Sequence, residues 1–272
     1  MVSFNGVLKK LGFLFYYLKP GSINDRVVRY LDRTKKDDYN WDNYTTMYKS
    51  ELRSIKGKHT QILKDNDYQF VDQKLVKTNQ DILPLHVNHR LLYETILQLS
   101  PNSILEIGCG GGDHLANNIL LNKEIVPYGT DISSNQISLL HDRHPNLKAW
   151  TSVSDSKELL PNYFPMVDLA YTQAVIMHIH KNDGHLIALQ NIFSKAKKHV
   201  ILMENWNTHN FVEDIKNLHK ANLIKWPELY LYFRRSPELN NKPYILIASS
   251  LKINEYEILN DDSTLKHPIK KE

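Results

Sequence analysis

Hydrophobic positions follow two different periods along the chain. From residue 41, over "WDNYTTMYKSELRSI", apolar and aromatic side chains recur at helical spacing. After Pro84 the same spacing predicts a helix, which Ser100-Pro101 ends. Short apolar runs then alternate with helical patterns as far as residue 252. Such alternation indicates an α/β fold, with a mostly parallel sheet and helices on both faces.

The short apolar runs predict the strands of this sheet. The last two runs are joined by a loop with a proline and two asparagines, which favours an antiparallel pair at the end of the chain. The predicted strands are 103–107, 126–130, 147–153, 166–172, 199–205, 228–235 and 242–250. The helices predicted between them are 113–123, 133–144, 182–196 and 210–220.

We expect three parts: an N-terminal helical cap over 1–85, a ligand-binding α/β domain over 86–252, and a polar tail over 253–272. The apolar segment 7–19 is too short to span a membrane and reads as a packed or capping helix. The alternative is an interfacial helix that touches a membrane surface.

The aromatic stripe that starts at residue 41 has two readings. It either packs on the core or forms a lid whose aromatic residues face a substrate. In the lid reading, the substrate-binding candidates are Trp41, Tyr44 and Tyr48.

Composition excludes several classes of protein. A 272-residue chain with 42% hydrophobic residues can build a real core, and its net charge of +4 is mild for a nucleic-acid-binding protein. No stripe of arginines interleaved with aromatics indicates RNA, so we expect no nucleic-acid partner. The single cysteine, Cys109, permits neither an intrachain disulfide nor a cysteine-based zinc site, which suits the cytoplasm.

The stretch "LEIGCGGGD" carries the first chemical signal. Gly108, Gly110 and Gly112 alternate after a strand, but Glu106 precedes them. A carboxylate at the mouth of a glycine turn repels phosphate and suits an ammonium group. Asp131 ends the next strand, where a carboxylate can accept hydrogen bonds from both hydroxyls of a ribose. The pattern therefore favours a ligand with an amino-acid end, a nucleoside and no phosphate, and S-adenosylmethionine fits that description.

These segments also carry a family resemblance. "ILEIGCGGGDHL" and "YGTDIS" resemble the first two motifs of class I S-adenosylmethionine-dependent methyltransferases. "MVDLAYTQAVIMHI" resembles the fourth strand of that family and the segment after it. The resemblance covers about residues 86 to 252. It implies a seven-stranded, Rossmann-like sheet with a reversed last strand, S-adenosylmethionine as cofactor and S-adenosylhomocysteine as product.

The resemblance also implies cofactor-binding roles. Glu106 lies near the methionine amino group, the glycine loop lines the methionine, Asp131 binds the ribose, and Ile132 packs on adenine. Ser154 and Asp155, after the third strand, stand where the family contacts the adenine amino group. For Asp155, a simple turn role is the alternative. The cofactor-binding set is Glu106, Gly108, Cys109, Gly110, Gly112, Asp131, Ile132, Ser154, Asp155, Thr172 and Gln173.

Methyl transfer needs alignment of the acceptor and, often, removal of one proton, for which histidine is the usual residue. Catalytic candidates at the strand ends are His178 and His180, with His209 as a second choice beside Glu204, which we also place at the substrate. These four side chains can in principle converge on a metal. No second carboxylate clusters with them, so we expect none.

Three functional hypotheses stay open. The first is O-methylation of a small molecule, with a hydroxyl of a sugar or glycan precursor as acceptor. The second is N-methylation of a small amine or a protein side chain. The third, from another class, is a non-catalytic partner protein that binds the cofactor. The segment after the fourth strand, "YTQAVI", lacks the Asn/Asp-Pro-Pro-aromatic run of amino-methylating DNA enzymes.

Overall fold

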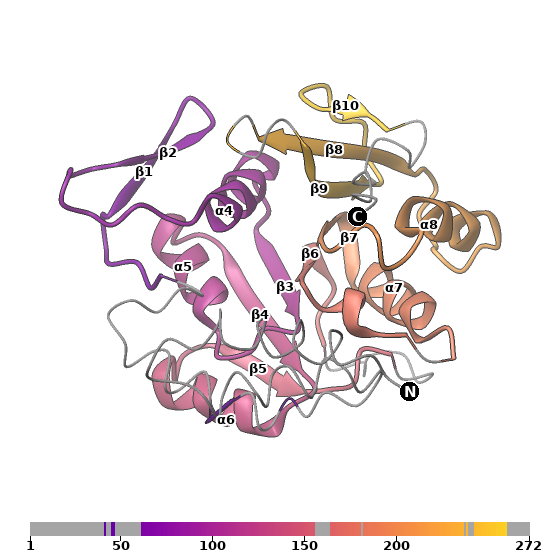
Figure 1. Cartoon of the computed structure of the whole chain (residues 1–272), viewed down its shortest axis with the longest axis horizontal. Coiled ribbons are helices and arrows are strands. Elements are labelled where there is room, and N and C mark those ends of the chain that lie inside the picture. The colour runs from indigo at the N-terminus through magenta and orange to yellow at the C-terminus, as the bar shows by residue number, and fades with distance from the viewer. Residues whose placement is uncertain are drawn as a thin grey trace, which may run out of the picture.

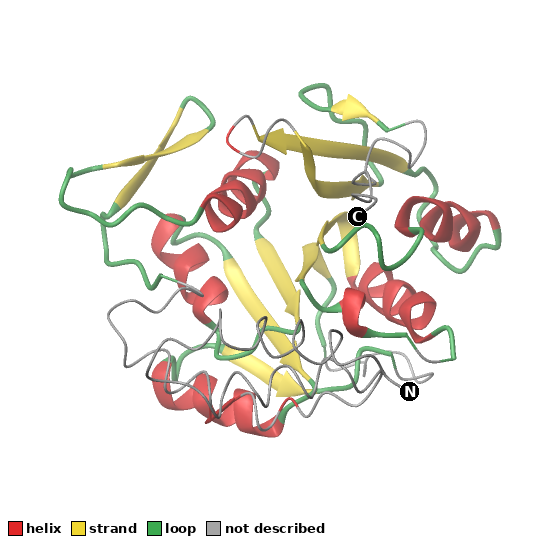
Figure 2. Ribbon diagram, viewed as in Figure 1, coloured by secondary structure: helices red, strands yellow, loops and turns green. Residues whose placement is uncertain are grey.

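The computed structural model describes residues 41, 45–46, 61–155, 164–180, 182–236, 238 and 242–259. Strands and helices alternate through most of this part (Figures 1 and 2). The strands are β1 Tyr68–Val71, β2 Lys74–Lys77, β3 Ser103–Ile107, β4 Val126–Asp131, β5 Lys148–Thr151, β6 Val167–Gln173, β7 Ala196–Met203, β8 Tyr230–Ser236, β9 Lys242–Ser249 and β10 Glu257–Ile258. The helices are α4 Val87–Leu99, α5 Asp113–Leu121, α6 Ser134–Arg143, the short 3-10 helix η1 Ile176–His178, α7 Gly184–Lys195 and α8 Phe211–Lys220.

Eight strands form one sheet in the order β10-β8-β9-β7-β6-β3-β4-β5. The five strands from β7 to β5 are parallel to one another. β9 runs antiparallel to both β7 and β8, so it is the reversed strand. β3 lies between β6 and β4 and pairs with both, so the strand order turns back between β3 and β6. A ligand crevice is expected beyond the carboxyl ends of the strands at such a point.

Two apolar layers cover the two faces of the sheet. α7 and α8 pack on one face, where Leu189 and Ile215 are fully buried against strand residues such as Val200. α4, α5 and α6 pack on the other, where Leu92 and Leu115 are fully buried. Because side chains point alternately to the two faces of a sheet, neighbouring residues of one strand belong to different layers. Figure 1 shows α7 and α8 on the side of β7, away from α5 and α6.

The seven predicted strands and the reversed last strand are confirmed, with two differences. A short eighth strand, β10, pairs with β8 inside the predicted tail. Within the predicted helical cap, residues 68–77 form an antiparallel hairpin, not a helix. Tyr68 and Leu75 anchor this hairpin to α4 in a small cluster of their own, while most of its other residues are exposed. The division into cap, domain and tail otherwise stays a prediction.

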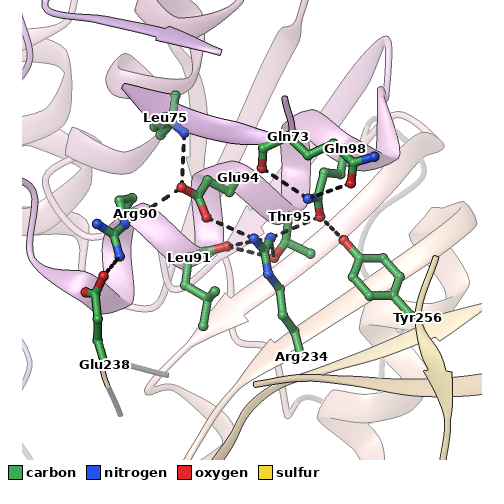
Figure 3. A network of polar contacts seen from close by, with 10 residues as sticks. All are labelled: Gln73, Leu75, Arg90, Leu91, Glu94, Thr95, Gln98, Arg234, Glu238 and Tyr256. Carbon is green, nitrogen blue, oxygen red and sulfur yellow. Dashed lines mark hydrogen bonds and ion pairs between the residues drawn. The ribbon is translucent and has the colours of Figure 1, made fainter. Parts of the chain in front are cut away.

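A polar network fastens α4 to the antiparallel edge of the sheet (Figure 3). The Arg234 guanidinium on β8 lies 2.8 Å from a carboxylate oxygen of Glu94 and donates a hydrogen bond of 2.8 Å to the Thr95 hydroxyl. The other Glu94 oxygen accepts a hydrogen bond from the backbone N–H of Leu75 at 3.0 Å, which ties in the hairpin. Gln98 extends the network to Tyr256, in the segment that precedes β10.

Candidate cofactor and acceptor site

The glycine loop between β3 and α5 is a tight turn in which Gly108, Gly110 and Gly112 all have positive φ, at 78°, 51° and 81°. The N–H groups of Gly108 and Cys109 both donate to the carbonyl of Thr130, at 2.7 and 3.0 Å, so the loop is held against the end of β4. Only glycine adopts such a backbone without strain. The loop is therefore built for close approach of a ligand.

Asp131 lies beside the glycine loop, at the end of β4. Its carboxylate accepts one hydrogen bond from the N–H of Gly110 and one from the N–H of Ser133, each at 2.9 Å. The carboxylate thus links the glycine loop to the start of α6. Each oxygen keeps further acceptor capacity, which a pair of ribose hydroxyls can use.

Apolar side chains beside Asp131 are exposed. Ile132 is 50% exposed and Val153, after β5, is 43% exposed. Ile132 follows β4, the neighbour of the strand that precedes the glycine loop, and Val153 follows β5, one strand further along the sheet. This is the place where the sequence predicts adenine, and two exposed apolar side chains there suit a flat aromatic ligand.

Ser154 and Asp155 are held against α7. The Ser154 carbonyl accepts a hydrogen bond of 2.6 Å from the Asn191 amide. Asp155 packs close to Gly184, at the start of α7, because a Cβ added there would lie 3.1 Å from a carboxylate oxygen of Asp155. Contact of these two residues with adenine stays a prediction.

Glu106 lies beneath the glycine loop and is only 2% exposed. The Tyr171 hydroxyl donates a hydrogen bond of 3.0 Å to its carboxylate. Burial raises the pKa of Glu106 well above its ordinary value, the Tyr171 bond opposes this rise, and the charge of Asp131 adds to it. A ligand ammonium group would favour the ionised carboxylate, so the predicted role of Glu106 suits its surroundings.

We expect Glu106→Gln to stabilise the ligand-free protein relative to wild type, and we expect this gain to grow as the pH rises. A carboxyl group whose pKa is raised in the folded state favours folding at low pH, and this contribution is lost as the pH climbs from the unfolded pKa through the folded pKa. Above pH about 5, the variant should gain on the order of 1 kcal/mol over wild type. Urea unfolding at pH 5 and pH 8 measures this, and a gain that shrinks towards pH 8 would contradict it.

Two side chains of the glycine loop, the charged Asp113 and the reactive Cys109, are accounted for by contacts within the protein. Asp113 forms an ion pair with Arg143 and lies 3.3 Å from Nε2 of His144, so its charge is compensated within the protein. Burial, with the charges of Asp131 and Glu106, raises the pKa of the Cys109 thiol well above its ordinary value. Cys109 is therefore a protonated packing residue, and Gly129 leaves room for its sulfur.

Two glycines of the loop give a matched pair of substitutions. A Cβ at Gly108 would lie 2.3 Å from Cγ2 of Val175, whereas one at Gly110 would meet only Gln136 Oε1, at 3.6 Å. Both alanines carry a left-handed backbone penalty of about 1 kcal/mol. Gly108→Ala should lose a further ~1–2 kcal/mol from overpacking. Thermal unfolding of both variants tests this, and equal losses would show that Val175 does not restrict the loop.

Thr172, Gln173 and Glu204 lie at the ends of β6 and β7. Thr172 is fully buried and its hydroxyl donates to Glu204 at 2.7 Å. The Glu204 carboxylate also accepts hydrogen bonds from the N–H groups of Val175 and Met177, at 3.1 to 3.2 Å. Glu204 thus braces the segment after β6, and substrate contact by it stays a prediction. Gln173 ends β6 with a buried Oε1 that has no hydrogen-bond partner among the described residues.

The predicted histidines gather beyond these strand ends. His180 and His209 have ring centroids 5.4 Å apart, and His209 stacks on His185 at 4.1 Å. His209 Nε2 lies 3.2 Å from the Ile176 carbonyl, so that nitrogen carries the hydrogen. Burial, followed by the charges of His185 and His180, lowers the pKa of His209 to about 4. His209 is therefore neutral at neutral pH.

The sequence interpretation missed His185 and Asp214. Nε2 of His185, on the first turn of α7, lies 3.6 Å from a carboxylate oxygen of Asp214, on the first turn of α8. Both residues occupy ordinary helical positions, so no motif singled them out. The arrangement places three imidazoles and one carboxylate at the starts of α7 and α8.

Of the three aromatic cap candidates, only Trp41 can be placed. Its ring meets that of His178 edge-on, with centroids 5.4 Å apart. Tyr44 and Tyr48 lie outside the described residues, as does the 7–19 segment. A cap residue and a histidine predicted separately therefore share one location.

The described part of the chain has neither a metal-binding cluster nor a membrane span. Within it, no three His, Cys, Asp or Glu side chains are arranged to hold a metal ion. In the same residues, no helix combines the length and the apolar character needed to cross a bilayer.

Comparisons with known proteins give fold likeness at low identity. No protein-family model matches the chain, and no curated protein matches it. Among solved structures, an amino pentose methyltransferase from Micromonospora echinaspora, involved in calicheamicin biosynthesis, is 14% identical, with a TM-score of 0.38. The match covers 44% of this chain and 51% of that one, so the chain spans about half of its length.

Two other similar structures are covered over most of their length. A TehB-like methyltransferase from Corynebacterium glutamicum is 17% identical, with 58% of this chain and 84% of that one covered at a TM-score of 0.43. A magnesium protoporphyrin IX methyltransferase from Synechocystis is 16% identical, with 60% and 80% covered at 0.41. All three are methyltransferases, described with bound S-adenosylmethionine or as dependent on it.

The fold itself is decided by the topology of this chain. Its central sheet has the reversed strand that the family resemblance implies, and its glycine loop and Asp131 lie at the carboxyl ends of adjacent strands. The mostly parallel, Rossmann-like α/β sheet with a reversed strand, predicted from the sequence, is the fold of this protein, with one strand more than predicted.

Proposed function

We propose that this chain is an S-adenosylmethionine-dependent methyltransferase that methylates a hydroxyl of a small acceptor, a sugar or glycan precursor. The observation that carries the proposal is the position of Asp131. It lies between a glycine loop with a buried acid beneath it and the exposed side chains of Ile132 and Val153. This end of the sheet thus offers, in order, an acid for an ammonium group, an acceptor for ribose hydroxyls and exposed apolar side chains for adenine.

The residues of the chain divide the work of the transfer. When bound, S-adenosylmethionine supplies a methyl group on a positively charged sulfur, which leaves as a neutral thioether. The protein must then align the acceptor oxygen with the methyl carbon and take up the proton of the acceptor hydroxyl. His178 and His180 are exposed beside the strand ends and are our candidates for this proton. His209 donates to the Ile176 carbonyl and holds the segment that carries them.

The electrostatics of the acceptor side favour O-methylation over N-methylation. An amine acceptor binds as an ammonium ion and needs a carboxylate. Of the two carboxylates beside the histidines, Glu204 accepts hydrogen bonds from Thr172 and the backbone, and Asp214 lies 3.6 Å from Nε2 of His185. A hydroxyl acceptor needs an imidazole that can take its proton instead, and His178 and His180 lie exposed at these strand ends.

Calorimetric titration separates the hypotheses. We expect S-adenosylmethionine and S-adenosylhomocysteine to bind at micromolar strength or better and NAD not to bind. Methyl transfer from labelled cofactor to matched hydroxyl and amino sugars then tests the acceptor. Transfer to the amine alone would favour N-methylation, and tight binding with no transfer to any acceptor would favour a non-catalytic partner protein. If neither adenosyl ligand binds, the proposal is wrong.

The histidine candidates need a readout of their own. His178→Gln and His180→Gln remove a proton acceptor but keep a side chain of similar size. The variant of the residue that takes the proton should lower kcat about 100-fold or more and flatten the rise of rate with pH. Asn205→Ala, an exposed neighbour after β7, serves as the control. Unchanged pH profiles in both histidine variants would exclude these side chains as proton acceptors.

A further inference from the structure

Stacked aromatic rings join the starts of α7 and α8, which lie side by side (Figure 1). His209, just before α8, stacks on His185, in the first turn of α7, with ring centroids 4.1 Å apart and an angle of 6° between the ring planes. The ring of Phe211 meets His209 edge-on, with centroids 5.5 Å apart. These two contacts fix the plane of the His209 ring.

The plane of the ring decides where the N–H of His209 points. Its Nε2 donates to the carbonyl of Ile176, 3.2 Å away in η1. A hydrogen bond weakens steeply as its angle departs from linear, so a tilted ring would lose this bond. The exposed His178 and His180 follow Ile176 closely along the chain. His209 therefore holds the segment that carries both candidate proton acceptors.

His185 has an orienting contact of its own. Its Nε2 lies 3.6 Å from a carboxylate oxygen of Asp214, in the first turn of α8, and the two side chains are only 16% and 19% exposed. This distance is too long for a hydrogen bond, but the carboxylate still attracts an N–H dipole where little water screens it. Asp214 thus favours the hydrogen of His185 on Nε2. The buried Nδ1 has no hydrogen-bond partner among the described residues, which suits the same tautomer.

We propose that His185 and Asp214 are positioning residues for methyl transfer, which act through His209. This rests on the proposed function, because the segment that they hold carries the candidates for the acceptor proton. Asp214 orients the ring of His185, the stack keeps His209 in its plane, and His209 holds the Ile176 carbonyl. His185 and Asp214 themselves need not touch the acceptor.

His185→Leu and His185→Phe test the stack, because leucine fills the space without a flat face and phenylalanine keeps one. The leucine variant should lower kcat about 10-fold with an unchanged KM for S-adenosylmethionine, since misplaced groups on the acceptor side slow the transfer without weakening cofactor binding. The phenylalanine variant should stay within about twofold of wild type. Equal kcat values in the two variants overturn the proposal.

Proton NMR of the ligand-free protein observes the His209 ring directly, through the Cε1–H signal that is lost in His209→Gln. Burial is the largest cause of its low pKa of about 4, and the charge of His185 comes next. His185→Leu removes both the charge and the flat cover, so the pKa of His209 should rise further than in His185→Phe, which keeps the cover. His219→Leu is the control, because His219 bonds the Trp226 carbonyl elsewhere on α8. An unchanged pKa of His209 in His185→Leu overturns the proposal.

Asp214→Asn separates orientation of the ring from stabilisation of the helix. An acidic residue in the first turn also favours α8 through the helix dipole, and the exposed Glu213 in the same turn shares only this role. We expect Asp214→Asn to lower kcat about threefold and Glu213→Gln to leave it unchanged. Equal effects of the two substitutions would show that Asp214 acts only through the helix, against the proposal.

The outcomes also separate this inference from the proposed function. If wild-type protein transfers methyl groups and both His185 variants match its kcat, only the positioning role is wrong. If wild-type protein transfers no methyl group to any acceptor, the proposed function is wrong and the inference falls with it.

Discussion

Asp131→Ala is expected to reduce affinity for S-adenosylhomocysteine about 100-fold, or about 2.7 kcal/mol. The substitution acts in two ways. It removes the acceptor for the ribose hydroxyls, and it leaves the N–H groups of Gly110 and Ser133 without the carboxylate that each contacts at 2.9 Å. The loop that should receive the ligand then loses its tie to α6. Calorimetric titration of folded variant and wild type gives the measurement.

Asp168→Ala is the matched control for this loss. Asp168 also accepts a backbone hydrogen bond, from Asn102 at 2.9 Å, and pairs with Lys198 at 3.2 Å. It lies near the start of β6, at the amino ends of the parallel strands, whereas Asp131 lies at the carboxyl end of β4. We expect it to cost stability and leave affinity unchanged. Similar affinity losses in both variants would mean that Asp131 acts through the fold and not at the ligand.

The features that could be predicted from the sequence are those that a single stretch of chain contains. The strands of the central sheet are short apolar runs, and the glycine loop and Asp131 follow two of them directly, so both could be placed from the sequence. The reversed strand followed from the family resemblance and from the Pro- and Asn-containing loop before β9. In each case, one stretch of chain contains the whole signal.

The features that were missed depend on geometry that no local pattern contains. The hairpin 68–77 turns at Asp72 and Gln73, both with positive φ, and glutamine gives no hint of such a turn. β10 has only two residues and exists because β8 has a free edge to pair with. His185 looks like any polar residue of a helix, and only its contacts with His209 and Asp214 distinguish it.

Loss of a single charge at the antiparallel edge of the sheet should lower the stability of the protein strongly. We expect Arg234→Met to lower the free energy of unfolding by about 3 kcal/mol. Methionine fills much of the arginine volume, so the loss comes from Glu94, whose side chain is 8% exposed and keeps a buried charge without its main partner. Gln98 and Thr95 lose a donor in the same step, as Figure 3 shows.

Two comparisons decide whether the buried charge of Glu94 causes the loss of stability. Arg235→Met changes the next, exposed arginine of β8 and should cost less than about 1 kcal/mol. Adding Glu94→Gln to Arg234→Met removes the charge but keeps an oxygen that can accept from the N–H of Leu75, so the double variant should be more stable than Arg234→Met alone. Urea unfolding of all variants measures this. If the double variant is less stable still, then the arginine contributes by packing along α4, and the role assigned to its charge is wrong.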